Sequence, residues 1–316
     1  MSDLIAQVMR ASAGSRHGMH YYSNAAKCGM RAMLSDKDRT DETVELAPSE
    51  DKIALRVGTL YHRLHEMWRL GMFPEADDAA VATAISPLGP LVSHSDASLQ
   101  EALRLFHAYQ MHWPRDLWGR VHGIELALPQ NAMQAELIRT RFGGVDVTGK
   151  LDMVVHLDEA ALAQAQERCA EITEPGTYIV DWKTAARTPD PLLYQLDVQA
   201  LWYPTLYQLC MSESEGGREM LARYPVRGTI FDVIIKQQRK REPAFNLGDF
   251  ACVYAAAPDV EQATAELQGL IEQGVFNVEQ AQKHNVGNRA ECVNERYGSA
   301  NICPYYGTKC LQGVTC

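Results

Sequence analysis

Apolar residues follow two different periods along the chain, and the change between them restricts the fold more than any other feature. From Ser49 to Gly71 and from Leu99 to Trp113 they recur every three or four residues, the spacing of one helix face. Later segments are short and rich in β-branched residues, as strands are: 121–128, 137–142, 145–157, 177–184 and 228–236. The combination predicts an α/β fold in which helices flank a central mixed sheet of four or five strands.

The segments between these strands have their own signals. Gly143-Gly144 predicts a hairpin between strands 137–142 and 145–157. The polar, alanine-rich stretch 158–176 predicts a surface insertion without a chemical role. A helical pattern runs from Leu192 to Cys210, where Pro204 should kink the helix, and another covers 258–284.

No linker rich in glycine, proline or serine divides the chain, so we expect one domain over 1–316. It would have a helical N-terminal part (1–113), a part with the sheet and its core helix (114–236) and a helical C-terminal part (237–316), the first and last packed together.

Charge, cysteine content and hydropathy exclude several classes of protein. Thirty Lys and Arg against 40 Asp and Glu give a net charge of −10, which argues against non-specific coating of nucleic acid. No apolar run reaches the ~18 residues of a membrane span, and the first 20 residues do not have the pattern of a secretory signal. We therefore expect a cytoplasmic protein without a membrane partner, whose eight cysteines are not disulfide-bonded.

Two acidic residues stand inside apolar strands, where a carboxylate needs a compensating partner. They are Asp152 in GKLDMVV and Asp181 in YIVDWKT. Lys183 follows Asp181 by two positions, which in a strand places both side chains on one face. Two carboxylates and an ammonium can hold Mg²⁺ or Mn²⁺ on a phosphate and orient or deprotonate a water. A buried Asp–Lys ion pair without catalytic function is the alternative.

Four short motifs occur in order around these residues. They are Gly58-Thr-Leu-Tyr-His62, Gly149-Lys-Leu-Asp152, Asp181-Trp-Lys183 and Gln199-Ala-Leu-Trp-Tyr203. Their order resembles the PD-(D/E)XK nuclease superfamily, and within it the RecB-like exonuclease branch. The resemblance implies the PD-(D/E)XK nuclease core as the fold.

The resemblance also implies a role for each matching residue. His62, Asp152 and Asp181 would be metal ligands, with the Trp182 carbonyl oxygen as another, and Lys183 would position or activate the water. Gln199 and Tyr203, four apart on a helix, would brace the site or touch DNA, although Tyr203 could equally be a core residue. Glu125 matches a further family acid less closely, and His65 is a second candidate for the histidine ligand.

Cysteines provide a second set of candidate ligands. Iron–sulfur nucleases of this branch, including CRISPR-associated and helicase-linked exonucleases, have one cysteine before the core and three after it. Here Cys28 precedes the histidine helix, and Cys303, Cys310 and Cys316 lie near the C-terminus. The resemblance implies a [4Fe–4S] cluster on these four thiolates. The Cys303–Cys310 spacing is longer than in the family, so Cys292 could replace one ligand, and structural zinc or inert thiols are the alternatives.

These features together predict a metal-dependent DNA exonuclease. It would act on single strands or duplex ends in recombination, repair or phage DNA processing, with Lys236 to Arg241 as a phosphate contact. No phosphate-binding G-x-x-x-x-G-K-[ST] loop occurs, so DNA unwinding would require a helicase or recombination partner. The alternatives are a structure-specific endonuclease and a non-catalytic DNA-binding subunit on a nuclease fold.

Overall fold

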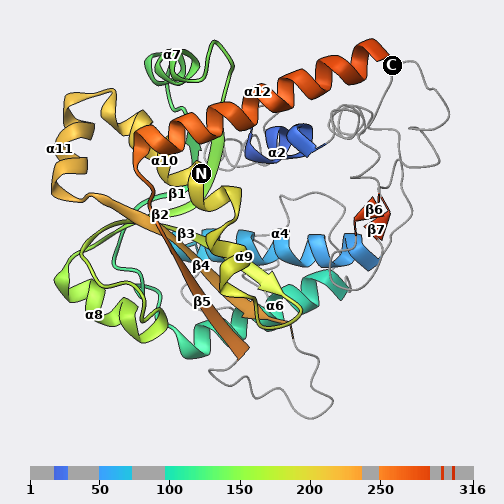
Figure 1. The fold of residues 1–316 in the computed structure, drawn as a ribbon. Helices are drawn as coiled ribbons and strands as arrows, with labels where there is room; N and C mark the ends of the chain where they lie inside the picture. The colour runs from blue at the N-terminus through green and yellow to red at the C-terminus, as the bar shows by residue number, and fades with distance from the viewer. Residues whose placement is uncertain are drawn as a thin grey trace. The chain divides into compact units, whose positions relative to one another are not determined.

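The computed structural model describes residues 18–27, 50–72, 97–236, 249–284, 293–294 and 301–302. Contacts divide the chain into two compact units. The first comprises Met1–Ala13, Pro48–Leu128 and Lys150–Pro258, and the second comprises Gly14–Ala47, Pro129–Gly149 and Asp259–Cys316. Figure 1 shows the elements of both units.

The first unit is built on a five-stranded sheet with the strand order β1-β2-β3-β4-β5 (Figure 1). Its strands are β1 (Arg120–Leu128), β2 (Gly149–Leu157), β3 (Gly176–Ala185), β4 (Val226–Ile235) and β5 (Phe250–Ala256). β3 runs parallel to β4, whereas β2 pairs with β3 and β5 with β4 in antiparallel fashion. The predicted mixed sheet is therefore confirmed, with β5 as a strand that the sequence pattern did not indicate.

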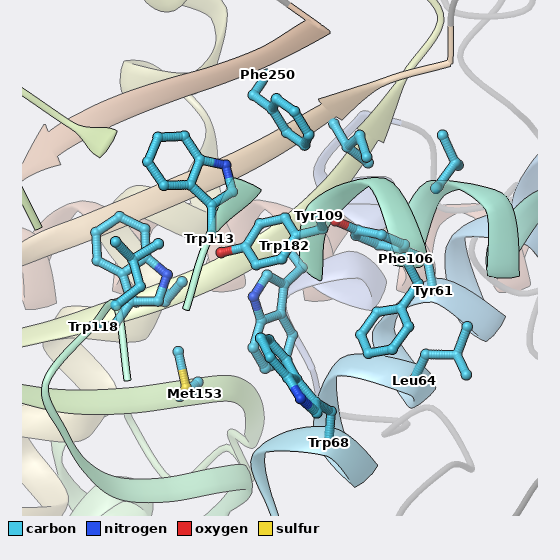
Figure 2. Packing of buried hydrophobic residues seen from close by; sticks show 14 of the residues in the cluster. Tyr61, Leu64, Trp68, Phe106, Tyr109, Trp113, Trp118, Met153, Trp182 and Phe250 are labelled. Atoms are coloured by element: carbon cyan, nitrogen blue, oxygen red, sulfur yellow. The ribbon is translucent and has the colours of Figure 1, made fainter. Parts of the chain in front are cut away.

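Helices accompany this sheet, and the predicted helices around 49–71 and 99–113 are confirmed. They are α4 (Glu50–Arg69), α6 (Ala97–His112), α8 (Glu159–Arg168), α9 (Pro191–Gln195), α10 (Val198–Ser212) and α11 (Glu215–Arg223). Side chains of α4 and α6 form one buried cluster with β2, β3 and β4. Figure 2 shows its aromatic part, in which Tyr61, Trp68, Phe106, Tyr109 and Trp182 lie together. This core fixes α4 against β3, the two elements that carry His62 and Asp181.

A buried carboxylate on β4 joins several of these elements. Asp232 accepts hydrogen bonds from Arg168 at 2.5 and 3.0 Å, from Tyr109 Oη at 2.6 Å and from Trp118 Nε1 at 3.3 Å. Arg168 also donates to the carbonyl oxygens of Val233 and Ala251. A fully partnered ion pair of this kind is tolerated in a core where an isolated charge would not be.

The predicted strand at 137–142 is wrong, because residues 137–141 belong to a helix, α7 (Ala132–Arg141), and Phe142 is its C-cap residue. The Asn131 side chain caps it by accepting from the Gln134 backbone N–H at 2.9 Å. Gly143 and Gly144 adopt positive φ, and the Gly144 N–H donates to the Arg139 carbonyl. The glycine pair therefore ends a helix instead of turning a hairpin.

The expectation of a surface insertion at 158–176 is also wrong. Residues 159–168 form α8, whose Leu162, Ala165 and Arg168 are buried in the first unit. The C-cap residue Cys169 is joined by a disulfide to Cys252 on β5, which corrects the expectation that no cysteine is disulfide-bonded. The segment is thus part of the core because its inner face meets the sheet.

The single long helix expected from Leu192 to Cys210 is two helices, α9 and α10. Asp197 separates them, since its side chain accepts from the Gln199 backbone N–H and caps α10. α10 includes Pro204 within its span.

The second unit joins elements from both ends of the chain. Besides α7 it contains α2 (Met19–Lys27), α12 (Val260–His284), β6 (Val293–Asn294) and β7 (Asn301–Ile302). α2 packs on α12, where a Cβ at Gly274 would lie 3.2 Å from the Ala25 Cβ, and Asn277 Nδ2 donates to the Ala25 and Ala26 carbonyls. A helix from the predicted N-terminal part, α2, therefore packs on α12 of the predicted C-terminal part. Cys28, Cys292, Cys303, Cys310 and Cys316 lie outside the described residues.

Among the described residues, no helix combines the length and apolarity that crossing a membrane would require.

Candidate active site

Asp181 and Lys183 form the centre of the site on β3. Two-residue spacing in the strand places them side by side, and Lys183 Nζ lies 2.5 Å from Asp181 Oδ2. Asp181 is 2 % exposed, whereas 24 % of the Lys183 side chain is accessible. Beyond Lys183, Asp181 Oδ2 has no hydrogen-bond partner among the described residues. The pair therefore presents one buried oxygen with spare acceptor capacity.

Asp152 reaches the same place from the neighbouring strand β2. Its Oδ2 accepts a hydrogen bond from the Trp182 backbone N–H at 3.1 Å. His62, on α4, places Nδ1 3.1 Å from the same oxygen. The structure thus brings together His62, Asp152, Asp181 and Lys183, which are up to 121 positions apart in the sequence.

The two carboxylates have very different pKa values, because their charged neighbours differ. Burial raises the pKa of Asp181 to about 7, and Asp152 adds to the rise although Lys183 opposes it. For Asp152, burial also acts to raise the pKa, but His62 and Lys183 outweigh it and hold the pKa at about 2. Two buried carboxylates this close are difficult to ionise together unless a cation joins them.

The two carboxylates raise the pKa values of the two basic groups. Burial would lower the pKa of His62, but Asp152 and Asp181 raise it above its usual value. The pKa of Lys183 is also raised, because Asp181 and Asp152 outweigh its desolvation. Both side chains therefore tend to carry positive charge beside the carboxylates.

Gln199 and Tyr203 lie on one face of α10 and contact each other. Gln199 Nε2 donates to Tyr203 Oη at 3.2 Å, and both residues are buried. Burial raises the pKa of Tyr203, and the charges of Asp181 and Asp152 raise it further. The tyrosine hydroxyl therefore lies within electrostatic range of the carboxylates.

Glu125 and Lys150 form an ion pair beside Asp152. Glu125 adopts a φ of 51°, which makes it the non-glycine residue with positive φ in the described part of the chain. Burial raises its pKa, and Asp152 raises it further. Sequence reasoning missed Lys150, although its position two residues before Asp152 on β2 could have indicated that both share a face.

His65, the second candidate for a ligand, lies in a different environment. Its ring stacks on Trp182 at 4.8 Å and meets Tyr61 and Tyr109 at 4.5 Å. Burial lowers its pKa well below the usual value. These contacts make His65 a neutral core residue. Lys236 is described and donates its backbone N–H to the Ala185 carbonyl, whereas Arg239 to Arg241 lie outside the described residues.

The chemistry of the donor set fits a divalent cation such as Mg²⁺. Mg²⁺ binds through one or two carboxylates and leaves its other positions to water and substrate phosphate. Asp152 and Asp181 supply such carboxylates, and the spare acceptor capacity of Asp181 Oδ2 is available for a cation. In the ranges that the structure describes, no group of three or more His, Cys, Asp or Glu side chains is arranged to hold a metal ion. Besides the two carboxylates, a bound Mg²⁺ would therefore depend on water, substrate phosphate or other donors.

A mixed sheet that carries two carboxylates and a lysine on neighbouring strands offers groups that hydrolysis of a phosphodiester could use. The family model described as "PD-(D/E)XK nuclease superfamily" matches residues 20–307, and the chain belongs to this superfamily. It is therefore a nuclease, a hydrolase whose substrate is nucleic acid, in a superfamily that generally uses divalent metals such as Mg²⁺. No curated protein and no solved structure matches the chain.

Proposed function

We propose that the protein is a metal-dependent DNA exonuclease of the RecB-like branch, acting on single strands or duplex ends. The observation that carries this proposal is the convergence of Asp152, Asp181 and Lys183, with His62 against Asp152. The order of the four sequence motifs supports the RecB-like branch. DNA processing in recombination, repair or phage replication, together with a helicase or recombination partner in the cytoplasm, would suit such an enzyme.

Each residue of the site has a defined part in phosphodiester hydrolysis. Asp152 and Asp181, with His62 and the Trp182 carbonyl as further donors, would hold the divalent ion, which supplies Lewis-acid activation and charge stabilisation. Lys183, fixed by Asp181, orients the attacking water and donates to the phosphate. The Trp182 N–H holds Asp152 in place, and Gln199 with Tyr203 braces the site from α10.

End-labelled DNA provides the direct test. Purified protein with Mg²⁺ or Mn²⁺ should release label from linear single-stranded or double-stranded DNA and should be inactive in chelator. Circular single-stranded DNA should remain intact. Cleavage of the circle would show a structure-specific endonuclease, and chelator-sensitive binding without cleavage of any DNA would favour the non-catalytic subunit.

His62→Ala should weaken Mn²⁺ binding about 10- to 100-fold and reduce cleavage, with partial recovery at high Mn²⁺. The reason is that the ion would lose a proposed ligand and that Asp152 loses the side chain in contact with its Oδ2. Calorimetric Mn²⁺ titration and cleavage rates measure both effects. His65→Phe is the matched control, because it keeps an aromatic ring in the core and should leave Mn²⁺ affinity unchanged. Equal affinities in wild type and His62→Ala would contradict a role at the metal.

A [4Fe–4S] cluster on Cys28, Cys303, Cys310 and Cys316 forms the second part of the proposal, with structural zinc as the alternative. The packing of α2 on α12 supports it, because Cys28 follows α2 in the sequence and the other three cysteines follow α12. Cys292 also stays a candidate ligand. Val293 and Ile302 are cross-strand partners, and Cys292 and Cys303 are their neighbours in the sequence.

Anaerobically purified protein should be brown, with four irons and four sulfides per chain by analogy with the branch. Serine at any one of the four cysteines should bleach the colour and lower the melting temperature, because the cluster closes a very long loop. Cys210→Ser is the control, since this buried thiol should not affect the absorbance. Cys292→Ser tests the substitute ligand. Colourless protein with one bound zinc would contradict the iron–sulfur proposal, and metal-free protein of normal stability would contradict any cluster.

A further inference from the structure

Lys150 lies at the edge of the active site, where its ammonium pairs with Glu125. The lysine side chain is 33 % exposed, whereas the glutamate side chain is only 14 % exposed. The strand order β1-β2-β3 places Glu125, Asp152 and Asp181 on three neighbouring strands of the sheet. Lys150 is therefore a cation that is both anchored and accessible beside the acids of the site.

The register of β2 and β3 gives Lys150 and Lys183 equivalent positions on the two strands. Beyond the last residues of the antiparallel pairing, each strand continues with an aspartate and, two positions later, a lysine. These are Asp152 and Lys150 on β2, and Asp181 and Lys183 on β3. Side chains two positions apart in a strand share a face. The charge of Asp152 also acts on both Asp181 and Lys183, so the two strands present one group of charges.

The charge balance of the chain makes a second accessible cation important for a phosphate-containing substrate. The chain carries a net charge of −10, so local cations must attract the phosphates. A lysine ammonium has three donors, and Lys150 can therefore donate to a phosphate while it stays paired with Glu125. Neighbouring strands lie about 4.8 Å apart, which brings the ammonium groups of Lys150 and Lys183 close enough for successive phosphates of one nucleic-acid strand.

Glu125 holds Lys150 from an unusual backbone conformation. Its φ of 51° is uncommon for a residue with a Cβ atom. Residues held in such conformations cluster at functional sites, where the surrounding structure maintains them. Burial raises the pKa of Glu125, and the charge of Asp152 raises it further, whereas Lys150 opposes the rise. The carboxylate thus depends on Lys150 for its charge and keeps the ammonium beside Asp152.

We propose that Lys150 binds the phosphate next to the scissile phosphate, so that efficient cleavage requires a charged linkage on this side of the bond that is cut. This inference rests on the proposed function, because the site of Asp181 and Lys183 defines which phosphate is cleaved. A phosphate contact carries no base information. We therefore expect the contact to select a continuous charged backbone and not a base sequence.

The salt dependence of DNA binding in chelator tests this contact without cleavage. Lys150→Ala should bind a single-stranded oligonucleotide about 3- to 10-fold more weakly than wild type, and the slope of log affinity against log salt should fall in magnitude by about 0.7. Lys150→Arg should restore both values. Arg227→Ala is the matched control and should bind as wild type, because Arg227 is also paired with a carboxylate, is 34 % exposed and lies near the start of β4.

Cleavage kinetics in Mg²⁺ or Mn²⁺ show where the contact lies. Lys150→Ala should raise KM about 3- to 10-fold and leave kcat unchanged, because a neighbouring phosphate is bound equally before and during the reaction. A neutral methylphosphonate at the second phosphate from the degraded end should raise KM of wild type by a similar factor, and should not raise KM of Lys150→Ala further. If Lys150→Ala does not fold, the double variant Glu125→Gln, Lys150→Ala removes the unpaired carboxylate and replaces it in both assays.

The outcomes separate this inference from the proposed function. Wild-type affinity and salt slope in Lys150→Ala, or a lower kcat with unchanged KM, would overturn the phosphate contact. A methylphosphonate effect that is as large in Lys150→Ala as in wild type would place the contact elsewhere and also overturn it. Binding that depends on Lys150 without cleavage of any DNA would instead refute the nuclease proposal and leave Lys150 as a phosphate contact.

Discussion

Asp181→Asn and Lys183→Ala should each reduce DNA cleavage by at least about 10²- to 10³-fold. Asp181 would lose the charge that holds the cation, and Lys183 would lose the ammonium that orients water and phosphate. Asp181→Asn should not unfold the protein, because the partner that remains is Lys183, whose side chain is 24 % exposed. Lys183→Ala leaves the buried Asp181 without its cation and should lower the melting temperature without unfolding the protein at room temperature. Single-turnover cleavage rates and thermal melting measure the two effects separately.

DNA affinity provides a further readout for these variants. Removing the Asp181 charge takes away one repulsion of the phosphate, so binding in chelator should be unchanged or tighter. Asp146→Asn is the control, because it removes an acid whose side chain is 52 % exposed and pairs with Arg139. Wild-type cleavage in either active-site variant, still sensitive to chelator, would show that these residues are not catalytic.

Asp232→Leu should lower the free energy of unfolding by about 3–5 kcal/mol. The change leaves the Arg168 guanidinium buried without a carboxylate and removes the acceptor of the Tyr109 and Trp118 hydrogen bonds. Denaturant unfolding followed by fluorescence measures the loss. Chelator should not change it, because the side chain of Asp232 is hydrogen-bonded to Arg168, Tyr109 and Trp118, and none of these is a proposed metal ligand.

Two further variants test whether the lost free energy of unfolding comes from the unpaired charge of Arg168. The double variant Arg168→Met, Asp232→Leu should be more stable than Asp232→Leu alone, because the uncompensated charge is gone. Glu174→Ala breaks the more exposed pair with Arg227 and should cost only about 0–1 kcal/mol. If Asp232→Leu cost no more than Glu174→Ala, the buried pair would not stabilise the first unit.

Local patterns in the sequence were sufficient for the fold class and for the main candidate residues. The helical period of 49–71 and 99–113 and the β-branched runs at 177–184 and 228–236 match α4, α6, β3 and β4. Each pattern extends over enough residues for one burial geometry to dominate. Asp181 and Lys183 share a face because strand periodicity alone requires it.

The sequence by itself therefore determined the α/β class, the motif order and the Asp181–Lys183 pair, because these follow from short-range periodicity. Tertiary structure decided the rest. The Asn131 cap and the glycine pair set the ends of α7, which contains most of the segment predicted as a strand at 137–142. α8 packs in the core, where Arg168 pairs with Asp232, 64 positions later in the sequence. Likewise, His62 meets Asp152 only because α4 packs on the sheet, since long-range contacts depend on burial and charge pairing that no local pattern encodes.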